Sequence, residues 1–198
     1  MKINTSKILS LAFLPILFFL PSCDIFSTRD AERPTEPRSD LPPANSLEIL
    51  IDNFEKSNEQ KLVQDYINCL SDSVFTGRGF TFIPSSEAAS QYPALSDWDI
   101  QSEENFFRNV ISASIEGVQI SLNILNENFS QQGDSLIYTA SYSLTVPFVD
   151  TDIPQNYQGE IEFHIFVDNT SIFRIYFWQD FKSSDLPSWS ELKGRLAN

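Results

Sequence analysis

The feature that most constrains the fold is a long stretch in which apolar and polar residues alternate. From Leu136 to Phe148, every second residue is apolar and its neighbours are mostly polar. Because successive side chains of a strand point to opposite faces of a sheet, this pattern predicts a long strand with one buried face. Further strands are predicted over residues 118–124, 157–167 and 172–181. Short turns separate these four segments, which favours an antiparallel, strongly curved meander.

The part of the chain before these strands has a helical period. Apolar residues recur three and four positions apart within residues 47–54, and the same spacing predicts helices over residues 59–71 and after Ser102. A short strand is expected within residues 76–84, a loop over residues 85–101, and a short closing helix within residues 187–196. Because the helices come first and the meander follows, the predicted class is α+β.

The N-terminus has the composition of a secretion signal. Lys2 and Lys7 precede an apolar run at residues 8–20 that is broken by Pro15. Such a run is too short to cross a hydrocarbon layer of about 30 Å as a helix, but it has the length of the apolar part of a signal peptide. A buried core segment is the alternative.

The four residues after this run resemble the lipobox of bacterial lipoproteins. Leu20, Ser22 and Cys23 match the box, whereas Pro21 departs from its usual small or aliphatic residue. The resemblance implies that residues 1–22 are a signal peptide and that Cys23 is lipidated and becomes the first residue of the mature chain. An ordinary signal peptide without lipidation is the alternative.

The predicted domains follow from this start. Residues 23–44 contain the lipidated Cys and then a proline-rich, charged stretch without hydrophobic periodicity, which is typical of a flexible tether. Residues 45–198 are predicted to form a single α+β domain. We expect the protein in the bacterial cell envelope, anchored by lipid to the outer rather than the inner membrane.

Charge excludes two classes of partner. The formal net charge is −14, and such a surface repels nucleic acid phosphates and anionic lipid headgroups. We therefore expect no nucleic acid partner, and a membrane attachment that comes from the lipid and not from charge. The chain has one His and two Cys, which leaves few ligands for a metal site. No metal and no cofactor are predicted.

The order of elements resembles a known superfamily. Two helices, a strand, a helix and four long strands, the last ending in Trp178-Gln179-Asp180, resemble the cone-shaped (cystatin-like) fold of the nuclear-transport-factor-like superfamily over residues 45–182. That superfamily includes ketosteroid isomerase, scytalone dehydratase and polyketide-cyclase-like proteins. The resemblance implies N-terminal helices in the concavity of a curved antiparallel sheet, with a pocket that some members use for catalysis and many for binding or assembly. It also allows a homodimer across the sheet.

Two functions are compatible with this resemblance. The favoured one is a non-catalytic envelope lipoprotein that binds a small apolar ligand or a partner protein in the cone-shaped pocket. The residues expected to line that pocket are large aromatic ones, namely Tyr66, Trp98, Tyr142, Phe163 and Trp178.

The alternative is an isomerase, dehydratase or cyclase, although no catalytic motif is present. A carboxylate beside Trp, Asp99 or Asp180, would then be the general base, and Tyr66 or Tyr142 would donate a hydrogen bond to a carbonyl. It requires these side chains to meet in one cavity.

Two further groups have simpler structural explanations. His164 shares a predicted strand face with Glu160 and Glu162, which could hold a cation but is typical of a solvated sheet face. Cys69 lies near the apolar side of a predicted helix, and with Cys23 lipidated it has no disulfide partner. We expect Cys69 to be a buried structural thiol.

Overall fold

The computed structural model describes residues 41–197, and in these a curved five-stranded sheet is the central element. The predicted signal peptide, Cys23 and most of the predicted tether lie outside the described residues. The strand order is β1-β5-β4-β3-β2. The strands are β1 (Thr81–Ile83), β2 (Ser121–Gln132), β3 (Ser135–Thr145), β4 (Asn156–Val167) and β5 (Phe173–Phe181).

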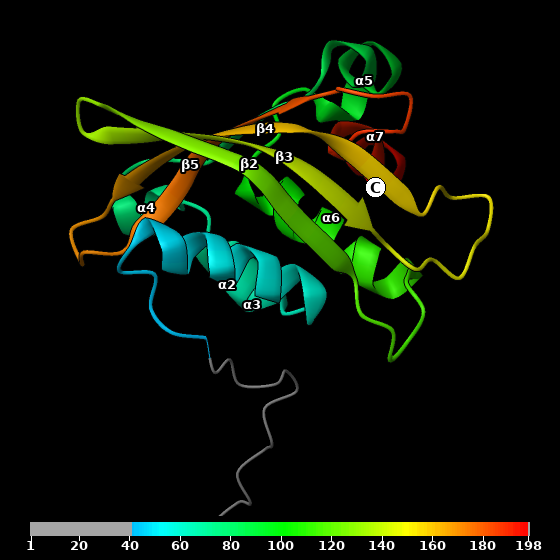
Figure 1. The fold of residues 1–198 in the computed structure, drawn as a ribbon, viewed down its shortest axis with the longest axis horizontal. Helices are drawn as coiled ribbons and strands as arrows, with labels where there is room; N and C mark the ends of the chain where they lie inside the picture. The colour runs from blue at the N-terminus through cyan, green and yellow to red at the C-terminus, as the bar shows by residue number, and fades with distance from the viewer. Residues whose placement is uncertain (1–40, 198) are drawn as a thin grey trace, which may run out of the picture. The chain divides into compact units, whose positions relative to one another are not determined.

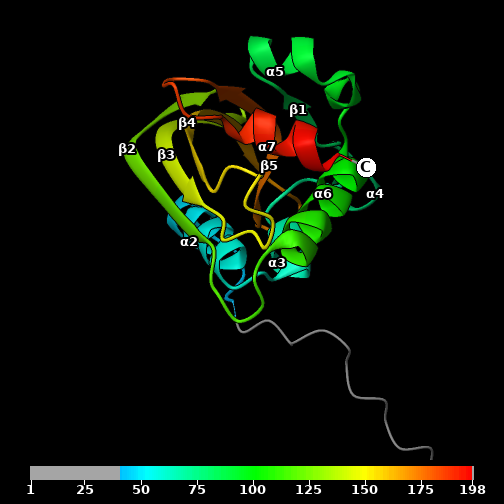
Figure 2. The same ribbon diagram turned by 90° about the vertical axis from the view of Figure 1, so that its right-hand side faces the viewer.

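Helices α2, α3 and α6 lie in the concavity of this sheet, whereas α5 lies beyond its edge (Figures 1 and 2). We call the sheet and the helices on its concave side the cone. Two of the helices, α2 and α6, present an apolar stripe at helical spacing to the sheet, as the sequence predicted. The helices are α2 (Leu47–Glu59), α3 (Val63–Asn68), α4 (Ser73–Thr76), α5 (Ser86–Gln91), the 3₁₀ helix η2 (Pro93–Leu95), α6 (Ile100–Ala113) and α7 (Trp189–Leu196).

A row of aromatic side chains crosses the sheet on its concave face. Tyr138 of β3 pairs with Phe163 of β4, which pairs with Trp178 of β5, which pairs with Phe82 of β1. Their rings are in contact, with centroid separations of 6.0, 5.3 and 5.4 Å along the row. All four residues are buried. Because replacing a buried aromatic by Ala ordinarily costs about 3–5 kcal/mol, this row is a main source of stability.

Helix α7 closes the wide end of the cone. Trp189 is buried against the rings of Phe54, Tyr142 and Trp178. Gly159 of β4, which is paired with Tyr142, makes this arrangement feasible. A Cβ atom at position 159 would lie 2.5 Å from the Phe181 carbonyl oxygen and 2.6 Å from the Tyr142 hydroxyl.

The structure differs from the predicted elements in several places. The helix predicted over residues 59–71 is the shorter α3, and the strand predicted over residues 118–124 is β2, which continues to Gln132. Strand β1 runs parallel to β5, so the sheet is mixed and not wholly antiparallel. Helix α6 begins at Ile100 and is capped by Asp99, not by Ser102, because the Asp99 carboxylate accepts the Ser102 N–H. The predicted loop at residues 85–101 contains α5 and η2. The long strand predicted from Leu136 is present as β3.

Candidate functional site

A buried carboxylate lies inside the cone, where the sequence analysis expected a pocket. Glu103, on the first turn of α6, is 0% exposed. Its Oε1 accepts a hydrogen bond from the Tyr66 hydroxyl at 2.6 Å, and its Oε2 accepts one from the Trp98 indole Nε1 at 2.6 Å. Lys193 of α7, also 0% exposed, donates to the same Oε2 and forms an ion pair with it. Each charge is thereby neutralised, which is the usual condition for burying one.

Aromatic rings surround the Lys193 ammonium. Its Nζ lies 3.7 Å from the ring centroid of Trp178 and 3.8 Å from that of Phe82. The rings of Trp98 and Phe106 lie at 5.6 and 5.5 Å. Such rings attract a cation through their quadrupole. Burial nevertheless lowers the pKa of Lys193 to about 8, although Glu103 opposes this shift.

A second buried carboxylate holds the start of α7. Asp180 of β5 is 0% exposed, and its Oδ1 accepts the Tyr142 hydroxyl at 2.8 Å. Its Oδ2 accepts the Ser190 N–H at 2.8 Å and the Ser190 hydroxyl at 2.5 Å. The Tyr142 oxygen accepts the Trp189 N–H at 2.6 Å. Asp180 and Tyr142 therefore accept hydrogen bonds from two N–H groups of the first turn of α7. A negative charge is favoured at this end of a helix. Burial raises the pKa of Asp180, and the hydrogen bonds from Ser190 and Tyr142 oppose the rise.

The residues considered for catalysis do not meet in one place. Asp180 and Tyr142 are in contact, but both are engaged with α7. Tyr66 binds Glu103 instead. Asp99 is on the surface, where the backbone and side-chain hydrogen bonds from Ser102 lower its pKa. The arrangement suits the anchoring of α7 better than it suits proton transfer to a substrate.

The five aromatic residues expected to line a pocket are all buried. Their exposed fractions are 0–4%, and four of them form hydrogen bonds or ring contacts inside the cone that leave little space. A cavity of about 10 Å³ lies between α6, α7 and the sheet, bordered by Phe106, Val110, Trp189 and Leu192. A water molecule needs about 10–15 Å³, so this space holds one at most.

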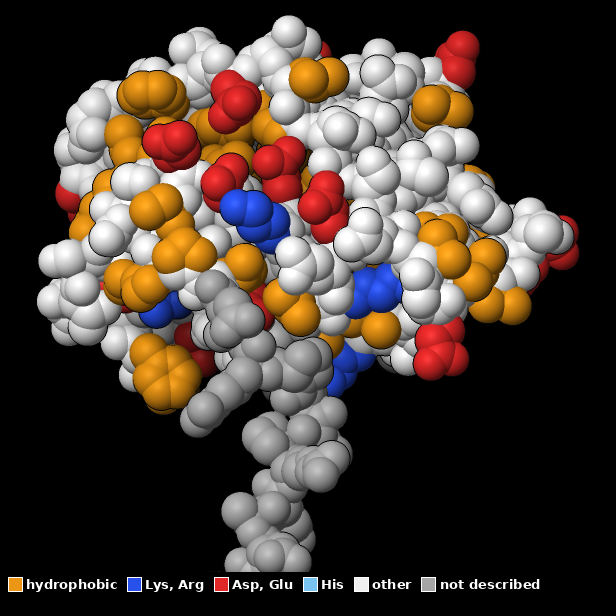
Figure 3. Space-filling model, turned by 60° about the horizontal axis from the view of Figure 1, so that its bottom comes forward, with side chains coloured by type: hydrophobic (Ala, Val, Ile, Leu, Met, Phe, Trp, Pro, Cys, Tyr) orange, Lys and Arg blue, Asp and Glu red, His pale blue; other side chains and the backbone are white. Residues whose placement is uncertain are grey.

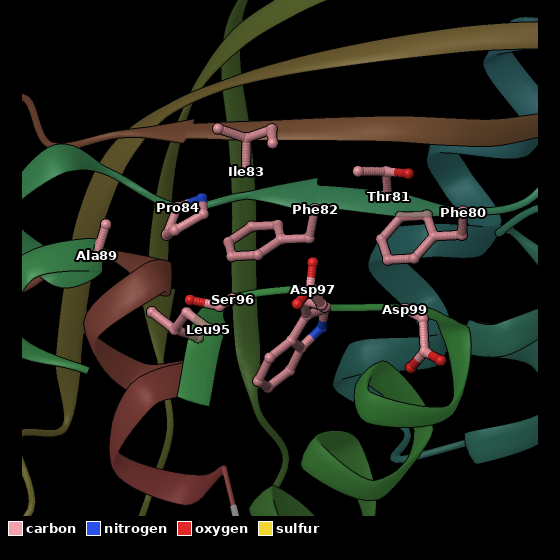
Figure 4. Close-up of a pocket in the computed structure, with 11 residues that line it drawn as sticks. Phe80, Thr81, Phe82, Ile83, Pro84, Ala89, Leu95, Ser96, Asp97 and Asp99 are labelled. Atoms are coloured by element: carbon pink, nitrogen blue, oxygen red, sulfur yellow. The ribbon is translucent and has the colours of Figure 1, made fainter. Parts of the chain in front are cut away.

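A larger cavity lies at the β1 edge of the cone, between β1 and the segment that links η2 to α6. We call it the outer groove, and its volume is about 560 Å³. Its floor includes the buried side chains of Phe82, Leu95 and Trp98, while Asp97 and Asp99 are exposed at its rim. Figure 4 shows Phe82 on the side of β1 that faces the segment carrying both acids. Trp98 is the expected pocket residue that reaches this groove.

The rings on the floor of the outer groove also contact the buried ion pair. Phe82 and Trp98 border the groove, and the same two rings lie within reach of the Lys193 ammonium. Trp98 is fixed by its hydrogen bond to Glu103. The buried pair therefore holds the floor of the groove in place.

The remaining groups are structural by geometry. His164 Nε2 lies 2.8 Å from Glu162 Oε1, whereas Glu160 is exposed. Within residues 41–197, no group of three His, Cys, Asp or Glu side chains is arranged to hold a metal ion. Cys69 is 2% exposed, its thiol donates to the Asp65 carbonyl oxygen at 3.3 Å, and burial raises its pKa to about 12. A thiol in this state is a poor nucleophile.

Comparison with known proteins gives the fold. No protein-family profile matches the sequence, and no curated protein does. A nuclear transport factor 2-like superfamily protein from Salmonella enterica superposes with a TM-score of 0.51 at 13% identity, over 70% of this chain and 87% of that one. This is a nuclear-transport-factor-like fold. The predicted α+β class and the predicted nuclear-transport-factor-like fold are thereby confirmed.

Other structures with the nuclear-transport-factor-like fold have enzyme names. A putative dehydratase from Streptomyces avermitilis has a TM-score of 0.50 at 7% identity, covering 71% of this chain and 96% of that one. A putative scytalone dehydratase from Novosphingobium aromaticivorans has a TM-score of 0.50 at 4% identity, covering 72% and 90%. Identities this low establish a shared fold and leave the function to the site.

Proposed function

We propose that this chain is a lipid-anchored protein of the bacterial cell envelope, held at the outer membrane through Cys23. The basic start, the apolar run at residues 8–20 and the lipobox-like residues 20–23 support this proposal. Within the part of the chain that the structure describes, no helix has the length and apolar character needed to cross a bilayer. The acyl chains at Cys23 would supply the attachment.

We further propose that the domain is a binding module and not an enzyme. The observation that carries this proposal is the occupied cone: the Lys193–Glu103 pair and α7 fill the space that a substrate would need. Both carboxylates inside the cone are committed to internal donors. The outer groove remains as the open recognition surface, and its volume is within the range of about 300–1,000 Å³ that is usual for ligand sites.

The chemistry of the outer groove favours an apolar ligand that carries a positive charge. The rings of Phe82 and Trp98 supply apolar contact area, and Asp97 and Asp99 supply negative charge at the rim. A ligand with an aromatic or alkyl body and an ammonium group would satisfy both features. The ligand class is thus narrower than the small apolar molecule or partner protein expected from the sequence.

A fluorescence titration tests this binding site. The probe is dansylcadaverine, a naphthalene with an alkylammonium tail, added to the chain without its first 22 residues, and dansyl amide is the uncharged control. We expect the charged probe to bind more tightly, and Asp97→Asn to remove the difference. Asn suits this position because the backbone there has φ 58°. Asp152→Asn, a change of an exposed Asp on the β3–β4 loop, is the matched control. Equal binding of both probes, or an equal effect of both substitutions, would refute the proposal.

A further inference from the structure

Helix α4 exposes two large apolar side chains. Val74 is 81% exposed and Phe75 is 79% exposed, which makes them the two most exposed large hydrophobic side chains in residues 41–197. They are adjacent and belong to a helix of four residues. Exposed apolar side chains grouped in this way are typical of a surface that contacts a membrane or a partner.

The backbone that carries these side chains is held firmly. Asp72 caps the start of α4 by accepting the Val74 N–H at 2.8 Å. The Thr76 hydroxyl donates to the Asp72 carbonyl oxygen at 2.8 Å, and the Ser71 hydroxyl donates to the Arg78 carbonyl oxygen at 2.6 Å. These bonds fix the turn on both sides. The apolar pair is thus displayed on an ordered projection.

Helix α4 projects close to the place where the described chain begins. The Phe173 N–H donates to the Ala44 carbonyl oxygen, and two residues further along β5 the Ser71 N–H donates to the Ile175 carbonyl oxygen. Two strand residues span about 7 Å, so the entering chain and the segment leading into α4 lie side by side on β5. Figure 3 shows hydrophobic side chains, and a group of acidic ones, on the face where the described chain begins.

We propose that α4 places Val74 and Phe75 in the interface of the membrane to which Cys23 is anchored. This inference rests on the proposed lipid anchor. Residues 24–40 separate Cys23 from the described domain, and even a fully extended chain of this length spans no more than about 60 Å. A tether of this length keeps the domain within reach of the bilayer. An exposed apolar pair on the domain would then add a second contact to the one made by the acyl chains.

Quenching by brominated phospholipid tests the contact. Phe75→Trp introduces an indole at the exposed position, while the native Trp98, Trp178 and Trp189 are 0–4% exposed. The lipidated full-length protein is reconstituted in vesicles of phosphatidylethanolamine and phosphatidylglycerol whose acyl chains are brominated. Val149→Trp is the matched control, because Val149 is 69% exposed and follows the far end of β3, about 35 Å along the strand from the α4 side.

We expect brominated lipid to reduce emission from position 75 and not from position 149. Mass spectrometry of the same sample reports lipidation of Cys23. A second arm holds residues 24–198 on nickel-chelating vesicles through an N-terminal histidine tag, so that the contact is tested even if the lipid anchor is wrong. Quenching at position 75 in this arm supports the contact. The membrane contact would be overturned by equal quenching at both positions or by no quenching at either. It would also be overturned if position 75 were protected from acrylamide but not quenched by lipid, a result that would indicate a protein partner.

Discussion

The buried pair of Lys193 and Glu103 gives the sharpest quantitative test of the filled cone. Lys193→Met keeps the length and apolar stem of the side chain and removes the ammonium. Burying the ammonium itself costs free energy, as the lowered pKa of Lys193 indicates, so losing that charge does not by itself destabilise the fold. The cost arises at Glu103, which keeps only its bonds from Tyr66 and Trp98 and is left buried without its counter-charge. We therefore expect the free energy of unfolding to fall by about 3–4 kcal/mol.

Urea denaturation of residues 41–198 at pH 7, followed by tryptophan fluorescence and by circular dichroism, measures this change. The matched control is the double substitution Glu103→Gln/Lys193→Met. The Gln amide can donate to the Tyr66 oxygen while its carbonyl accepts the Trp98 N–H, so no buried charge is left without a partner. We expect the double variant to be within about 1 kcal/mol of the original chain, since neutral replacements of a buried pair are often tolerated.

Two results would refute the reasoning about this pair. If Lys193→Met alone unfolds within about 1 kcal/mol of the original chain, the ammonium does not stabilise the closed cone. If the double variant is less stable than Lys193→Met, the two charges are not coupled.

Three other predictions concern pH and packing. The native pKa of Lys193 lies below its ordinary value of 10.5, so the unfolded chain binds the proton more tightly, and Lys193 should contribute a gain in stability of up to about 3 kcal/mol between pH 8 and pH 10. The gain is measured as the difference between urea titrations of the original chain and of Lys193→Met, because the opposing effect of the raised Cys69 pKa is common to both. Gly159→Ala should destabilise the domain by about 2 kcal/mol or more in thermal melts, because the methyl group meets the Tyr142 hydroxyl, whereas an unchanged melting temperature would contradict the close approach. Burial raises the pKa of Asp168, but hydrogen bonds from Thr170 and Arg174 outweigh it and hold the pKa at about 2. This carboxylate should therefore contribute stability above pH 4 that is lost as the pH falls toward 2. Acid titration of the stability of Asp168→Ala should lack this loss.

Much of the fold could be predicted because side-chain periodicity reports burial directly. The alternation from Leu136 gave β3, and the helical spacing from Leu47 gave α2, since each pattern has one apolar side. Strand β1 has only three residues, too few to show a period, and its parallel pairing depends on β5, which lies about 95 residues later in the chain. Partners so distant in sequence leave no local signal, so the mixed sheet was missed.

The buried ion pair was missed because charged residues near helix ends have a simpler local explanation. Glu103 lies in the first turn of a helix, where the helix dipole favours an acid whether or not it is buried. Yet Glu103 shares a face with Phe106, Phe107 and Val110, and Lys193 shares one with Trp189 and Leu192. The available signal for the buried pair was two opposite charges, each at an apolar position of a different helix. The sequence alone could not pair them, because that requires the position of α7 in the cone.

The filled cone also explains why the residues expected to line a pocket lie on the concave side while no open pocket lies in front of them. Tyr66, Tyr142, Phe163 and Trp178 are on the concave side, as their positions on α3, β3, β4 and β5 require. The closing helix occupies the space in front of them. Short C-terminal segments are hard to place from sequence, because their contacts are almost entirely tertiary.

Mass spectrometry of the protein extracted from membranes tests the attachment through Cys23 directly. We expect an N-terminal peptide that begins at Cys23 and carries a thioether-linked diacylglyceryl group, with no peptide from residues 1–22. Cys23→Ser should abolish both the modification and the membrane association. An unmodified Cys23 in the membrane fraction, or membrane-bound Cys23→Ser protein, would contradict it.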